Sequence, residues 1–379
     1  MPSLIPFNKP HFTTKELSTI SQSLQTGKIS GDGPFTKLCS DYFESRYQFP
    51  KTMLTTSCTD ALEICALLLE IQEGDEVIMP SYTFVSSANP FILRGAKIVF
   101  ADSYPDNPNI DPVAIEALIT PRTKAIVVVH YAGIACDMSS IMNLAERYRI
   151  RVVEDAAQGI DAFHNDKPLG GIGDLGALSF HETKNIICGE GGLLIVNDPK
   201  VGKRAEIIRE KGTNRSAFFR GEINKYGWVD VGSSFLPSDI LAALLYAQLM
   251  ELDDIQSRRA KLWLNYYNEL ISLHTTYGVG IPLVPHYARH NAHLFYLVCR
   301  SPEERTNLMN SLKSKHIQSA FHYQSLHKSA YFHSKHDGRQ LPNADRFSEC
   351  LVRLPLFYGL DEHSQARVIE AVRAYYQGQ

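Results

Sequence analysis

The chain has 379 residues and a formal net charge of -3 at pH 7, with 44% hydrophobic and 21% charged residues. These values are typical of a folded globular protein of about two domains, and they exclude disordered, collagen-like and coiled-coil chains. No basic field exists that would attract a nucleic acid or an anionic membrane. The seven cysteines are scattered without a CxxC pair, and residues 1–12 lack the apolar run of a signal peptide. We therefore expect a reduced, cytoplasmic protein.

Short β-branched runs alternate with helix-like stretches from about residue 53 to residue 198. Several runs are apolar at consecutive positions, which is typical of strands that are covered on both faces. The alternation predicts an α/β fold with a largely parallel central sheet. The predicted strands are 53–55, 77–79, 97–101, 125–130, 151–154, 177–180 and 193–196, and the predicted helices are 59–70, 139–148 and 200–211.

The pattern changes after residue 212. Residues 213–234 are rich in glycine, asparagine, arginine and aromatic residues and have no clear period, and a loop of this length is usually functional or contacts another chain. An α+β segment follows, with predicted helices 238–252, 255–273 and 364–376 and predicted strands 294–298 and 320–323. We therefore expect a large domain of residues 1–250 and a smaller C-terminal domain of residues 251–379.

Ser57, Cys58 and Thr59 form the turn between the first predicted strand and the helix 59–70. Free N–H groups and the dipole at a helix start attract an anion, and the hydroxyl groups add donors. The alternative is ordinary N-capping by a serine or threonine. Cys58 is either a nucleophile that the helix start activates or a small residue that suits a tight turn.

Glu154 and Asp155 end a buried strand and point to opposite faces, so only one of them can face a site. Asp155 lies at the carboxyl edge, where open α/β sheets bind ligands. A buried carboxylate needs a cationic partner, and the alternative to a ligand is a structural ion pair.

Lys184 comes just past the end of another buried strand, beside the glycine-rich turn 189–192. Partial burial favours a neutral amine, which is what a Schiff-base lysine requires, although a lysine is most often solvated surface.

Two other patterns carry no site. Residues 171–176 read GIGDLG and match the dinucleotide-binding pattern, but a polar turn precedes them and a strand follows. That pattern needs a strand before it and a helix after it, so we expect no nicotinamide site. His327, His333 and His336 have loose spacing without an accompanying acid or cysteine pattern, so we expect no metal site.

The remaining features fit a pyridoxal phosphate (PLP) site. This cofactor needs a lysine for its aldehyde, an acid for its pyridine nitrogen and an anion site for its phosphate. Lys184, Asp155 and the turn 57–59 are candidates for these parts. Residues 80–84 (PSYTF) supply an aromatic face at another strand end.

EDAAQ at 154–158, SFHETKN at 179–185 and GEGG at 189–192 resemble the sugar aminotransferases of the DegT/DnrJ/EryC1/StrS family. The resemblance extends over nearly the whole chain and includes residues 5–8, 31–33, 80–84, 129–133 and 322–327. It implies a fold type I PLP-dependent aminotransferase that works as a homodimer with shared active sites. It also implies a dTDP-sugar and glutamate as substrates.

The resemblance implies that Lys184 binds the cofactor aldehyde and moves the proton, and that Asp155 pairs with the pyridine nitrogen. The other cofactor contacts that it implies are Phe84 on the ring, Gln158 near the ring hydroxyl, and Ser57, Cys58, Thr59 and Ser179 around the phosphate. Ser234 stands where many relatives place an asparagine from the partner subunit, so we expect residues 211–234 to cross between subunits. The candidate substrate-binding residues are His181, Arg215, Arg220, His322, Tyr323 and His327.

His181 and the GEGG turn favour relatives that aminate C4 of the sugar, because relatives acting at C3 tend to carry SFYPxKNLG and GDGG. We therefore expect transfer of nitrogen from glutamate to C4 of a dTDP-4-keto-6-deoxyhexose to give the galacto amine. The alternatives are the gluco epimer, action at C3, and a cofactor-binding regulator without turnover. His181 is alternatively a packing residue. Lys184 argues against the regulator, because a protein without turnover does not need it.

Overall fold

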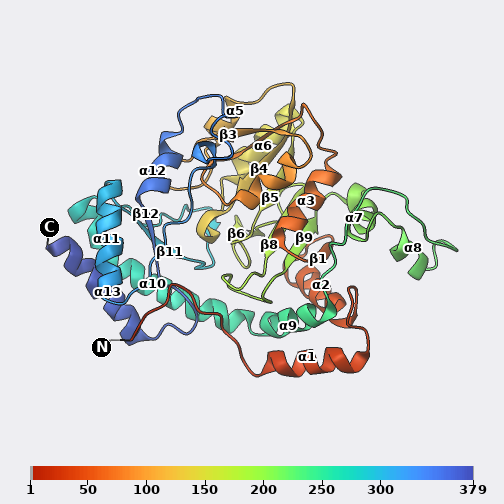
Figure 1. The fold of residues 1–379 in the computed structure, drawn as a ribbon, viewed down its shortest axis with the longest axis horizontal. Helices are drawn as coiled ribbons and strands as arrows, with labels where there is room; N and C mark the ends of the chain where they lie inside the picture. The colour runs from red at the N-terminus through yellow and green to blue at the C-terminus, as the bar shows by residue number, and fades with distance from the viewer. Residues whose placement is uncertain (1–2, 379) are drawn as a thin grey trace.

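A seven-stranded sheet forms the centre of the computed structural model, which describes residues 3–378 (Figure 1). The strand order is β1-β9-β8-β5-β4-β2-β3, and β9 alone runs against the other six. The expected α/β fold with a largely parallel sheet is confirmed. The strands are β1 (Thr52–Thr55), β2 (Glu76–Pro80), β3 (Lys97–Ala101), β4 (Thr123–Val129), β5 (Arg151–Asp155), β8 (Leu175–Ser179) and β9 (Gly192–Val196).

Helices cover both faces of this sheet, which is why its strands are apolar at consecutive positions. One face packs on α3 (Cys58–Leu68) and α7 (Gly202–Arg209). The other face packs on α2 (Pro34–Tyr47) and α9 (Asp239–Met250) at one end and on α6 (Met138–Tyr148) at the other. The remaining helices of this part are α1 (Lys15–Thr26), α4 (Asn89–Ile92), α5 (Pro112–Glu116) and α8 (Arg215–Phe219).

The C-terminal part begins with the long helix α10 (Leu252–Tyr277), one residue after α9 ends. Its antiparallel pair, β11 (Phe295–Val298) and β12 (Leu351–Leu354), packs with three more helices. These are α11 (Pro302–Ser314), α12 (Pro342–Cys350) and α13 (Glu362–Gln377), and a small separate sheet contains β6 (Phe163–His164), β7 (Lys167–Pro168) and β10 (Ala288–Arg289). Ile5 pairs with Ile317, so the N-terminal segment joins this C-terminal part. Residues 1–2 and 379 of the predicted domains lie outside the described residues.

The predicted strand 320–323 is wrong. Only Ala320 pairs with the small sheet, in an isolated bridge to Arg353, and Ser325 forms the next bridge, to Tyr82. The segment therefore crosses from the small sheet to the large one instead of extending either of them. The sequence also missed α1, α2, α11 and α12, and the predicted loop 213–234 contains the short helix α8.

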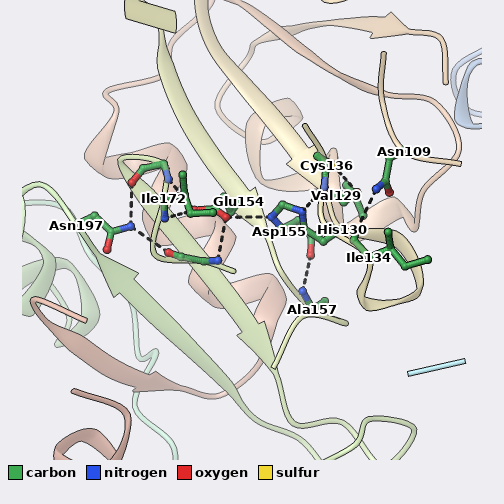
Figure 2. Close-up of polar contacts among 12 residues, drawn as sticks. Asn109, Val129, His130, Ile134, Cys136, Glu154, Asp155, Ala157, Ile172 and Asn197 are labelled. Atoms are coloured by element: carbon green, nitrogen blue, oxygen red, sulfur yellow. Dashed lines mark hydrogen bonds and ion pairs between the residues drawn. The ribbon is translucent and has the colours of Figure 1, made fainter. Parts of the chain in front are cut away.

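The buried carboxylate of Glu154 organises the interior behind the sheet edge, as Figure 2 shows. It accepts hydrogen bonds at 2.6–2.9 Å from the N–H groups of Gly170, Ile172 and Gly173. His130 Nε2 donates to it at 3.0 Å, because His130 Nδ1 accepts from the N–H of Cys136 and so carries no proton. The loop 171–176, which matches the dinucleotide-binding pattern, thus binds the side-chain carboxylate of Glu154.

Burial raises the pKa of Glu154, but the hydrogen bonds from His130 and from the glycine loop outweigh this effect, and the pKa lies below its ordinary value. Glu154 is therefore the ionised, structural member of the Glu154–Asp155 pair. Asp155 is left facing the opposite side of the strand.

Glu154→Ala is expected to lower the free energy of unfolding by about 3–5 kcal/mol, since it leaves four buried donors without their acceptor. Urea unfolding followed by circular dichroism measures this loss. Glu116→Ala is the control, because the exposed ion pair of Glu116 with Arg147 contributes at most about 1 kcal/mol. Equal losses for the two variants would contradict a structural role for Glu154.

Candidate active site

The carboxyl ends of five parallel strands, β1, β2, β4, β5 and β8, meet at one edge of the sheet, and a cavity of about 470 Å³ lies there. The C-terminal part supplies the facing wall. The sequence-predicted residues that line this cavity are Ser57, Cys58, Thr59, Phe84, Asp155, Gln158, Ser179, His181, Lys184, His322 and Tyr323. The topology therefore brings together residues that lie far apart in the sequence.

The start of α3 forms one end of the cavity. Ser57 is its N-cap, and its Oγ accepts the N–H of Asp60 at 3.0 Å. Capping uses that one donor, and the first N–H groups of the helix, on Cys58 and Thr59, have no acceptor within the helix. Gly192 passes so close that a Cβ there would lie 2.4 Å from the Ser57 carbonyl. The turn is thus fixed by packing and retains free donors for an anion.

Cys58 lies in this turn as a neutral thiol. Burial raises the pKa of Cys58 well above its ordinary value, and the nearby Asp155 carboxylate adds to the effect. A thiol held in this state is a poor nucleophile. The structure therefore favours the small-residue interpretation of Cys58 over the nucleophile.

Asp155 projects from the end of β5 and is 6% exposed. Its Oδ2 accepts from Ser87 Oγ at 2.6 Å, and its Oδ1 accepts from the N–H of Ala157 at 3.1 Å. Within residues 3–378, no lysine, arginine or histidine nitrogen lies within 4.0 Å of this carboxylate. Asp155 therefore forms no structural ion pair with the described residues. Its carboxylate faces the cavity without a counter-ion among them.

Lys184 follows β8 in a tight turn that is closed by the Lys184 N–H to His181 carbonyl bond of 2.9 Å. The residue is half-buried, and its Nζ makes no hydrogen bond or ion pair among the described residues. Asn185 anchors the turn, because its Nδ2 donates to the Asn291 carbonyl at 2.9 Å and its Oδ1 lies 2.8 Å from His293 Nδ1. The lysine amine is thus free, and the backbone that carries it is fixed.

Gln158 and two aromatic rings complete the side between Asp155 and the opening. Gln158 Oε1 accepts from the N–H of Ala132 at 2.6 Å, and its Nε2 donates to the hydroxyl of Tyr323 at 3.2 Å. Phe84 is 54% exposed, and its ring centre lies 5.8 Å from that of Tyr323. An apolar face is therefore available to a flat ligand.

Four predicted residues do not line the cavity. Arg215 pairs with Glu210, Arg220 pairs with Glu206 and Glu222, and Ser234 forms a backbone bridge to Glu210. His327 is buried, with its Nδ1 2.7 Å from Ser81 Oγ, so within this chain it holds the C-terminal part against the end of β2. This position does not support a substrate contact for His327.

Arg353 and His293 also line the cavity, and neither was predicted from the sequence. Arg353 stands in the otherwise apolar strand β12, and a charged residue in a buried strand is the signal that was available. Nothing in the sequence around His293 indicated a residue of the site. Burial lowers the pKa of His293 well below its ordinary value, so it is neutral beside Asn185.

Among residues 3–378, no group of three or more His, Cys, Asp or Glu side chains is arranged to hold a metal ion. In the same residues, no helix has both the length and the apolar character needed to cross a bilayer.

The model of the DegT/DnrJ/EryC1/StrS aminotransferase family matches residues 10–373. The aminotransferase TlmJ of Streptoalloteichus hindustanus is 27% identical, with a TM-score of 0.91 over 99% of this chain and 100% of that one. Spr1654 of Streptococcus pneumoniae, in its PMP form, is 26% identical, with a TM-score of 0.91 over 99% of both chains. DesV of S. venezuelae, in complex with a ketimine intermediate, is 29% identical, with a TM-score of 0.90 over 99% of both chains.

The cofactor is PLP, which alternates with its amino form PMP, and the cavity residues fit it. The free N–H groups at the start of α3 suit a phosphate. The buried Asp155 carboxylate, which has no cationic partner in residues 3–378, suits a protonated ring nitrogen. The unpartnered amine of Lys184 suits the aldehyde.

Proposed function

The chain belongs to the DegT/DnrJ/EryC1/StrS family of PLP-dependent sugar aminotransferases, and we propose that it aminates C4 of dTDP-4-keto-6-deoxy-D-glucose. The donor would be L-glutamate and the product dTDP-4-amino-4,6-dideoxy-D-galactose. The observation that carries the proposed chemistry is the convergence of Lys184, Asp155 and the α3 start on one cavity.

Several stretches support this substrate. SCT at 57–59, REKGTNRS at 209–216 and GSS at 232–234 resemble the dTDP-4-amino-4,6-dideoxygalactose transaminase of enterobacterial common antigen synthesis. His181 and the GEGG turn at 189–192 favour the relatives that act at C4 over those that act at C3. His181 also lies at the cavity, with its Nε2 3.7 Å from a carboxylate oxygen of Glu190, where it is available to the sugar.

PLP, when bound, supplies an aldehyde that takes up the amino group and a ring that withdraws negative charge from the reacting carbon. The Nζ of Lys184 would take the proton from the amino acid Cα and deliver one to C4 of the sugar in the second half-reaction. Asp155 would hold a proton on the ring nitrogen, and the N–H groups of Cys58 and Thr59 would bind the phosphate. Tyr323 and Leu356 form part of the opposite wall and would exclude water.

The decisive experiment is NMR of the product that the purified protein forms from dTDP-4-keto-6-deoxy-D-glucose and L-glutamate. An axial amine at C4 is the expected result. An equatorial amine would identify the gluco epimer, and an amine at C3 would identify the other family branch. No product, with an intact bound cofactor, would contradict the proposed substrates.

We further propose that the protein is a homodimer whose subunits share their active sites. Residues 211–234 project from the body of the chain, with α8 and a coil that reaches beyond it in the outer part (Figure 1). Their large apolar side chains are exposed, including Trp228 at 83% and Phe219 at 69%. The base of this arm is fixed by backbone bridges, Glu210 to Ser234 and Thr213 to Trp228. Exposed aromatics on an anchored arm favour contact with a second copy of the chain.

If the arm completes the partner's site, inactive variants are expected to complement each other. Subunits with Lys184→Ala are mixed with subunits with Arg215→Ala and Arg220→Ala, under conditions of subunit exchange. A hybrid dimer has one site with both an intact lysine and an intact arm, so activity should rise above that of either parent. Ultracentrifugation verifies the dimer. A monomer, or no rescue after demonstrated exchange, would contradict the shared site.

A further inference from the structure

Arg353 is a buried cation in the cavity wall without a counter-ion among the described residues. It is 6% exposed, and its Nε donates to the hydroxyl of Tyr131 at 3.0 Å. Its Nη2 is buried without an acceptor, and among residues 3–378 no carboxylate oxygen lies within 4.0 Å of its guanidinium. Burying a charge in this way is unfavourable unless a partner arrives.

A comparison with Arg259 shows what a purely structural buried arginine looks like in this chain. Arg259 donates to three backbone carbonyls, those of Ala292, His293 and Leu356, at 3.2, 2.6 and 3.4 Å. Arg353 instead has aromatic rings around it, with its Cζ 5.2 Å from the Tyr131 ring centre and 4.8 Å from that of Tyr323. Those rings position the guanidinium but leave donor capacity unused.

The place of Arg353 in the cavity indicates which anion it takes. It lines the same cavity as Lys184 and Tyr323, and the Tyr323 ring faces Arg353 while the Tyr323 hydroxyl contacts Gln158. An amino acid carries its carboxylate directly on the carbon that reacts at Lys184. The diphosphate of a nucleotide sugar is attached at C1, across the ring from C4. A deeply buried cation in the wall of the cavity that holds the lysine therefore suits the carboxylate.

We propose that Arg353 binds the α-carboxylate of the amino donor, and that it acts in the amino-acid half-reaction only. The identity of the donor as glutamate rests on the proposed function, but the recognition of an α-carboxylate does not. Arg353 thus gives one cavity a fixed cation for the amino acid, while the sugar nucleotide uses other contacts.

The test separates the two half-reactions in single turnovers of the PLP-loaded enzyme. In Arg353→Met, the L-glutamate concentration that gives half the maximal rate of cofactor conversion should rise about tenfold to a hundredfold, because a charged hydrogen-bonded contact is lost. The reaction of the amino form with dTDP-4-keto-6-deoxy-D-glucose should keep its half-saturating concentration. Arg353→Lys should retain part of the glutamate affinity, since it keeps the charge but not the fork of donors.

The unfolding temperature also separates the two roles. If Arg353 were structural, Arg353→Met would unfold at a lower temperature than the parent. Arg353→Met should unfold at the same temperature as the parent or higher, because an uncompensated buried charge is replaced by an apolar chain of similar length. Arg259→Met is the matched control and should unfold earlier, since it leaves three buried carbonyls without donors. If Arg353→Met does not fold, Arg353→Gln, which keeps a donor for Tyr131, takes its place.

An unchanged response to glutamate, or equal losses in both half-reactions, would overturn the proposal for Arg353. If glutamate does not convert the cofactor in the parent enzyme, the proposed donor is wrong. The same titration is then made with L-alanine and L-aspartate. A loss that follows whichever amino acid is used then supports Arg353 as the carboxylate site. No loss with the amino acid that is used overturns it.

Discussion

Lys184→Ala is expected to lower the rate of transamination by at least about a thousandfold. The variant loses the amine that binds the cofactor aldehyde and the group that moves the proton in both half-reactions. In the parent protein, borohydride reduction followed by peptide mapping should find the cofactor on the peptide that contains Lys184. Steady-state rates with glutamate and the keto sugar nucleotide measure the loss in the variant.

The fold and the phosphate end of the site are expected to survive this substitution, because Nζ makes no bond to other described residues. Lys184→Ala should therefore still bind PLP through the start of α3, and added methylamine should restore part of the proton transfer. Lys167→Ala, at an exposed position on β7, is the control and should behave like the parent. Normal turnover by Lys184→Ala would contradict the assignment of the lysine.

The residues that the sequence located well are those whose position follows from strand order. Parallel strands end at one edge, so Ser57 after β1, Phe84 after β2, Asp155 at the end of β5 and Lys184 after β8 had to lie close together once the sheet was recognised. The sequence favoured Asp155 over Glu154 by its place at the strand end and by the family resemblance, but it did not show what Glu154 does. That role depends on the glycine loop and His130, which meet Glu154 only in the folded chain.

His327, which the structure places away from the cavity, and Arg353, which was not predicted, both depend on contacts between distant parts of the chain. His327 carries the chemistry of a ligand-binding residue, yet its partner Ser81 lies 246 positions away and fixes it in the interior. Arg353 enters the cavity only because β12 pairs with β11 and faces the edge of the other sheet. Neither a periodicity nor a local motif encodes such a pairing between distant segments.

Asp155→Asn is expected to lower the transamination rate by about a hundredfold to a thousandfold while the fold is retained. A contact between unit charges inside a protein contributes roughly 4 kcal/mol at an effective dielectric constant near 20, which corresponds to about a thousandfold in rate if it acts mainly on the transition state. The neutral amide cannot hold the ring nitrogen protonated, so the ring would withdraw charge less well from the reacting carbon. Single-turnover rates with saturating glutamate measure this loss without a contribution from substrate binding.

Asp155→Asn is expected to change the stability of the fold little. The asparagine side chain of the variant would keep an oxygen for the N–H of Ala157, and no cation among the described residues loses its partner, since Asp155 has none. Thermal unfolding should therefore be close to that of the parent. Ser87→Ala, which removes the 2.6 Å bond to Oδ2 but keeps the carboxylate charge, is the graded control and should lose less activity than Asp155→Asn. If Asp155→Asn kept near-native activity, the unpaired carboxylate would not serve the ring nitrogen, and its burial would have to be explained by the Ser87 and Ala157 contacts alone.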